Sequence, residues 1–175
     1  PQSALAATRN WDGDTSVTWS AAGNWDGGIT APANNLTDDI ANFNLAGPYS
    51  GTTTPRNPNA GTTSINGITI GALNGAMTLT TGTTPGLSIG SSGITIASGA
   101  GALTVPATSI VTIGANQSWT NNDNDAATFN GANVFTNKLT LAGGDFIFSG
   151  VNTGSGGIDL NAGNLIATVA AGFGP

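Results

Sequence analysis

The 175-residue sequence predicts an all-β protein whose chain coils into a parallel β-solenoid. Helix signals are poor, because no window of about eleven residues keeps a helical apolar spacing without Gly, Pro or Asn. Short apolar–polar–apolar units closed by Gly or Ser recur instead, and such alternation places the flanking apolar residues on one face of a strand. From residue 87 to 113 these units return about every seven to nine residues, with connections as short as Gly90–Gly93.

The strand units follow one another along most of the chain. Pieces of about three to five residues are too short to form a stable sheet from hairpins alone, but they fit the sides of stacked coils. A coil of about 20–25 residues would place about four or five coils between residues 60 and 170. A β-sandwich is the alternative fold, because strands at regular spacing also describe sandwiches. The units are 68–70, 87–89, 94–96, 103–105, 111–113, 139–141, 146–148 and 158–160.

The N-terminal region differs from the rest in composition. Residues 9–49 contain three of the four tryptophans, and large aromatic side chains cover much area per residue. The terminal coils of a stacked protein are usually atypical, because they must cover an open core. We therefore expect residues 1–50 to form an extension and cap, continuous with a solenoid body at 51–175. The predicted cap residues are Trp11, Trp19, Trp25 and Phe43.

The composition excludes several classes of function. The chain has three basic and nine acidic residues, a net charge of −6, and neither His nor Cys. Three scattered basic residues cannot neutralise a phosphate backbone, so no nucleic-acid partner is expected. Catalytic triads and the usual zinc and haem sites are excluded without His and Cys. No apolar run is long enough for a membrane helix, so we expect no membrane insertion, no enzymatic activity and no cofactor.

One stretch near the N-terminus resembles a known family. The run Trp19-Ser20-Ala21-Ala22-Gly23-Asn24-Trp25-Asp26-Gly27-Gly28 is followed by Pro32, Asn34, Asp39, Ala41 and Phe43. This pattern resembles the opening of bacterial surface proteins with autotransporter-associated β-strand repeats, and residues 93–119 are similar to their repetitive body. The resemblance implies a right-handed β-solenoid, an extracellular or cell-surface location after removal of a signal peptide absent from this sequence, no catalysis, and a passenger or fibre role.

Two residue patterns suggest ligand sites. Asn121–Asp125 is dense in oxygen ligands, and Asp123 and Asp125 are the candidates for Ca²⁺, which prefers closely spaced Asp and Asn. The alternative is a turn in which these side chains bond their own backbone. A set of threonines between apolar neighbours would form an outward ladder if the coils stack in register, as on an ice-binding face; the alternative is that Thr simply suits exposed strands. These threonines are Thr69, Thr95, Thr104, Thr112 and Thr140.

The two ends of the chain are the predicted assembly sites. The run from 164 to 173 is apolar, β-prone and uncharged, and unpaired sheet edges invite pairing with another chain. We expect a non-catalytic structural protein that forms an extracellular filament or surface matrix with copies of itself, joined head-to-tail through such edges or by exchange of a terminal strand. A glycan-binding adhesin that recognises extracellular glycans, and an ice-binding module, are the alternatives. The predicted assembly residues are Ala4, Leu5, Leu165, Ile166, Val169 and Phe173.

Overall fold

The computed structural model describes residues 6–44, 58–61, 63–83 and 86–168, and these residues confirm the all-β class. They contain strands β1 to β15 and one short 3-10 turn, η1 (Ala22–Asn24), and no α-helix. The strands are β1 (Ala7–Asn10), β2 (Asp39–Phe43), β3 (Asn59–Gly61), β4 (Thr63–Ile70), β5 (Met77–Thr78), β6 (Thr80–Thr81), β7 (Leu87–Ile96), β8 (Leu103–Val105), β9 (Ile110–Ile113), β10 (Gln117–Asn121), β11 (Ala127–Phe129), β12 (Ala132–Val134), β13 (Leu139–Phe148), β14 (Asn152–Thr153) and β15 (Ile158–Ala167).

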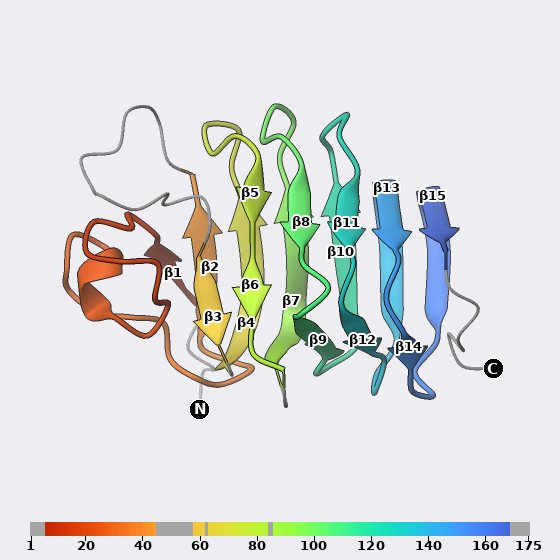
Figure 1. The fold of residues 1–175 in the computed structure, drawn as a ribbon, viewed down its shortest axis with the longest axis horizontal. Coiled ribbons are helices and arrows are strands. Elements are labelled where there is room, and N and C mark those ends of the chain that lie inside the picture. Colours follow the sequence, from red (N-terminus) through yellow and green to blue (C-terminus); the bar gives the residue numbers. More distant parts are fainter. Residues whose placement is uncertain (1–5, 45–57, 62, 84–85, 169–175) are drawn as a thin grey trace.

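The strands form a curled parallel sheet that extends along the long axis of the molecule (Figure 1). Strand β13 explains the curl, because its first residues pair with β10 and its last residues pair with β11. The sheet therefore ascends along one side through β1, β2, β4, β7 and β10, and returns along another through β11, β8 and β5. Among the described residues every pairing between named strands is parallel, so the alternative of a β-sandwich, which needs antiparallel sheets, is not supported.

The spacing between paired strands shortens along the chain. Ala7 pairs with Asp39, which is 32 residues away, whereas Gly67 pairs with Gly93 at 26 and Leu139 pairs with Ile158 at 19. Most of these spacings lie near the expected value of about 20–25 residues, with the longest at the N-terminal end. Strand β2 pairs with β4, so the sheet continues from the predicted cap into the predicted body.

Apolar side chains stack in register to form the core. One column consists of residues that each pair with the next, and all are buried except the last. This arrangement follows from the alternating pattern, which places every second side chain on the inner face of the curled sheet. The column is Ala41, Ile68, Ile94, Trp119, Leu141 and Leu160.

The segment Gly90–Gly93, expected to be a connection, lies inside the continuous strand β7. The strand bends there instead of ending. Gly93 has φ +62, and a side chain on it would collide with the carbonyl oxygen of Ser118 in the next strand. Gly144 has φ +73 at the equivalent bend of β13. Glycine tolerates this backbone conformation without steric cost, so two predicted units join into one bent strand.

Candidate assembly edge

Strand β15 is the last strand of the sheet and pairs only with β13 within the described residues. Its inward side chains lie directly on those of β13, with Leu160 on Leu141 and Leu165 on Phe146. Leu141 and Phe146 are 0% exposed, whereas Leu160 is 48% exposed. The apolar column therefore ends at β15 with one side uncovered by the described part of the chain.

The backbone of β15 also has a free edge. The N–H of Leu139 donates to the carbonyl of Gly157 at 3.1 Å, and the N–H of Thr168 donates to the carbonyl of Phe148 at 3.2 Å. Because the backbone groups of successive strand residues point to opposite edges, these bonds fix the direction of all the others. The N–H and C=O groups of four β15 residues therefore point away from β13, and these residues are Ile158, Leu160, Leu165 and Ala167.

The predicted assembly residues fall partly on this edge. Leu165 is partly buried in β15, and its neighbour Ile166 is 46% exposed. The prediction omitted Ile158 and Leu160, which belong to the same edge. Their alternation with Asp159 identified a strand, but only the register with β13 reveals that no described strand follows it. The other predicted assembly residues, Ala4, Leu5, Val169 and Phe173, lie outside the described residues.

The N-terminal end of the sheet contrasts with this open edge. The main-chain N–H and C=O of Asn10 in β1 are both bonded by Asp26, through its Oδ1 at 2.9 Å and its N–H at 2.8 Å. The guanidinium of Arg9 lies 3.8 Å from Asp26 and 3.4 Å from the carboxylate of Asp39. The backbone edge of β1 is thus occupied at Asn10 and exposed at Thr8.

The four predicted cap residues form one buried cluster at this N-terminal end. The ring centroid of Trp25 lies 4.9 Å from that of Trp11, 5.0 Å from that of Trp19 and 5.9 Å from that of Phe43. The indole N–H of Trp25 donates to the carbonyl of Trp19 at 2.6 Å. All four side chains are at most 2% exposed.

Asn24 organises the loop that holds this cluster, a role that sequence reasoning missed. Its side-chain oxygen accepts from the N–H groups of Thr15 and Ser16 at 2.9 and 2.8 Å. Its side-chain nitrogen donates to the hydroxyl of Ser16 and to the carbonyl of Thr18. The position of Asn24 directly before Trp25 was the available signal, but the four partners come from a loop without strand periodicity.

The calcium candidates Asp123 and Asp125 lie in a turn that bonds its own backbone. The Asp123 carboxylate accepts the N–H of Asp125 at 2.9 Å and that of Gly101, in the preceding turn, at 3.3 Å. The N–H of Asp125 is the main reason why the pKa of Asp123 is lowered. Among the described residues, no three acidic side chains converge in a group that could hold a metal ion. This geometry matches the Asx-turn alternative and joins two successive turns.

The threonines do stack, but in separate columns. Thr69 pairs with Thr95, which pairs with Thr120, whereas Thr104 pairs with Thr78 and Thr128 in another part of the sheet. Thr112 and Thr140 belong to neither column: Thr112 pairs with Ser88, and Thr140 with Ser118 and Asp159. The expected set of five threonines is therefore divided into short ladders on different sides.

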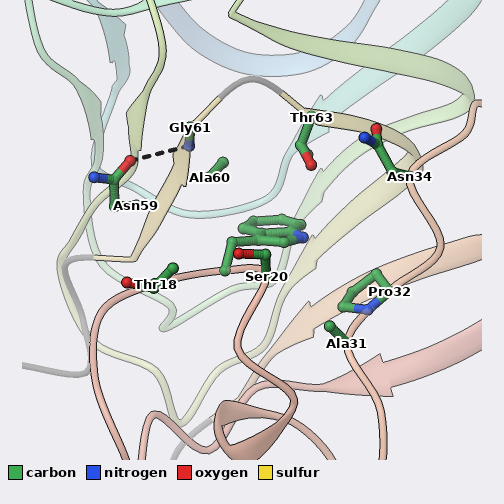
Figure 2. A pocket seen from close by; sticks show the side chains of 10 residues that line it. Thr18, Ser20, Ala31, Pro32, Asn34, Asn59, Ala60, Gly61 and Thr63 are labelled. Carbon is green, nitrogen blue, oxygen red and sulfur yellow. Dashed lines mark hydrogen bonds between the residues drawn. The ribbon is translucent and has the colours of Figure 1, made fainter.

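A hollow of about 360 Å³ lies beside the aromatic cluster, with Trp19 in its lining. Asn34 and Pro32 lie on one side of it, and Thr18 and Asn59 lie on the other (Figure 2). The Asn59 side-chain oxygen is used by the N–H of Gly61 at 3.0 Å. Sugar recognition by an aromatic ring requires an exposed ring face, and Trp19 is only 2% exposed.

No family model, curated protein or solved structure matches the chain. In the described part of the chain, no helix has the length and apolarity needed to cross a membrane.

Proposed function

We propose that the chain is a non-catalytic structural protein, a right-handed β-solenoid that joins with copies of itself through exposed strand edges. The observation that carries this proposal is β15, a ten-residue strand with a free backbone edge and a half-exposed Leu160 above a fully buried Leu141. Natural proteins usually cover, charge or shorten such an edge, because it attracts other strands.

Two further features support the solenoid interpretation. Successive parallel strands return to the same column after 19 to 32 residues, and inner side chains stack directly on one another. Each turn of the chain then contacts mainly its neighbours, so length can be added by adding turns. The low charge and the resemblance to bacterial surface proteins place the assembly outside the cell, as a filament or surface matrix.

The glycan-binding and ice-binding alternatives have less support. The tryptophan nearest the hollow has no exposed face for a sugar, and the threonine ladders are short and lie on different sides of the sheet. A flat ice-binding face needs neighbouring rows, whereas a structural role needs only continuous stacking.

Removing one backbone donor from β15 tests the proposal. The N–H of Ala167 points away from β13, so Ala167→Pro removes a donor from the free edge and leaves the pairing with β13 in place. We expect the unchanged protein to sediment faster than its 17.1 kDa monomer and to give regular particles or filaments by negative-stain electron microscopy.

The Ala167→Pro variant is expected to remain monomeric, and Ala167→Ser, which keeps the N–H, is expected to assemble like the unchanged protein. A monomeric unchanged protein, or equal assembly by Ala167→Pro, would contradict self-association through β15.

A further inference from the structure

We propose that β15 pairs with β15 of a second copy across a two-fold axis, in an antiparallel junction between the C-terminal ends of two molecules. This inference rests on the proposed self-association and specifies the geometry of its contact. The axis passes between Ala162 and Gly163, at the bend of the strand, where Gly163 has φ +86. An isologous contact of this kind uses the same surface on both copies.

The side chains of β15 are symmetric about that axis. Ile158 and Leu160 face inward before the bend, as do Leu165 and Ala167 after it, because each lies on a buried side chain of β13. Antiparallel pairing around the axis places Leu160 opposite the partner's Leu165 and Ile158 opposite the partner's Ala167. The two open apolar columns therefore cover each other.

The free backbone groups have the same symmetry. In an antiparallel pair, two opposed residues whose backbone groups point toward each other exchange both hydrogen bonds. Leu160 and Leu165 both point away from their own β13, so they form such a pair across the axis, and Ile158 and Ala167 form another. The outward N–H and C=O groups of all four residues thus find partners in one register.

Charge and the state of the other end favour this junction over head-to-tail addition. Asp159 is the charged residue of β15, and the two-fold register places it opposite the partner's Ile166, roughly 20 Å from the partner's Asp159 along the strand. Head-to-tail addition would need the outer edge of β1, where Asp26 already bonds Asn10. The two-fold junction leaves that end outside the contact, so the dimer becomes the building block of any larger assembly.

Disulfide trapping tests this register, and the chain has no cysteine of its own to interfere. Asp159 and Ile166 are both exposed and face each other across the proposed junction. Mixing Asp159→Cys with Ile166→Cys under mild oxidation should give a disulfide-linked heterodimer, because opposed Cα atoms in such a pair are within disulfide range. Each variant alone should give little, because identical positions lie far apart across the axis.

A second mixture tests head-to-tail stacking. The parallel registers place Thr8 and Asp159 in the same column at opposite ends of the molecule, so Thr8→Cys should link to Asp159→Cys only if copies stack head-to-tail. Oligomers with a Thr8–Asp159 link and no Asp159–Ile166 link would overturn the two-fold junction but keep the proposed function. A monomeric unchanged protein would overturn both.

A charge on the edge gives an independent measurement by analytical ultracentrifugation. Leu160→Lys places an ammonium at the apolar contact of both copies, and we expect it to raise the dimer dissociation constant at least tenfold. Leu160 is half-exposed in the monomer, so the substitution leaves the core of the fold intact. Thr153→Lys, at an exposed position in β14, adds the same charge and should leave dimerisation unchanged. Equal dissociation constants for both variants would contradict the junction.

Discussion

Truncating Trp25 to alanine should remove much of the stability of the N-terminal end. The indole is 0% exposed, so its removal exposes or empties roughly 150–250 Å² of contact, equivalent to about 4–6 kcal/mol at about 25 cal/mol per Å². Measured substitutions of this type cost about 3–5 kcal/mol. The carbonyl of Trp19 also loses its donor, and three ring contacts disappear. We therefore expect a loss of about 4–5 kcal/mol, which is a large part of the stability of a typical domain.

Native-state hydrogen exchange measures where this loss falls. Each coil contacts mainly its neighbours, so protection should fall most in β1 and β2, which lie against the cluster, and least in β13. The matched variant Trp25→Phe keeps an aromatic ring but loses the indole donor, and it should cost about 1–3 kcal/mol. A loss below about 1 kcal/mol for Trp25→Ala, or equal loss of protection in β13 and β2, would refute a local capping role.

Two other perturbations follow from the turns. Gly93→Ala forces a side chain into a left-handed conformation and against the carbonyl of Ser118, so we expect a loss of at least about 2 kcal/mol, whereas Gly143→Ala, where the nearest atoms are 3.9 Å from the new carbon, should be close to neutral in thermal denaturation. Asp123 has a lowered pKa, caused first by the N–H of Asp125, so its stabilisation is present above the model value of 3.8 and disappears as the pH falls through its folded pKa. Asp123→Asn should therefore flatten the acid side of the Tm profile, and an unchanged profile would show that this contact does not contribute.

The alternating pattern predicted the strands well because it is a local signal. Ile68–Ile70 and Leu103–Val105 lie in strands with their outer residues buried, as the period of two requires. The same pattern could not show that Leu87–Ile89 and Ile94–Ile96 belong to one bent strand. That outcome depends on the positive φ of Gly93 and on its approach to the next strand, and both are set by packing between coils rather than by neighbouring residues.

The sites were harder to predict for the same reason. The tryptophans near the N-terminus were assigned to one cluster from composition, and the structure brings them together. Asn24 was missed because its partners come from a loop, and Leu160 was missed because its exposure depends on which strand is last. Residues with local hydrogen-bonding patterns, such as Asp123, are ambiguous in sequence between a ligand and a turn, because both roles use the same oxygen atoms.

The two ends of the sheet differ in a way that bears on assembly. The N-terminal end has the longest spacing between paired strands, and the additional residues form the loop that carries Trp19, Trp25 and Asp26 over β1. The C-terminal end has the shortest spacing, 19 residues, which leaves room for strands and tight turns but for no such loop. A coil that short exposes its inner side chains unless another coil covers them. The shortening of the coils therefore makes the C-terminal end the natural place for a partner, and it explains why one end of this sheet is blocked within the chain while the other remains available.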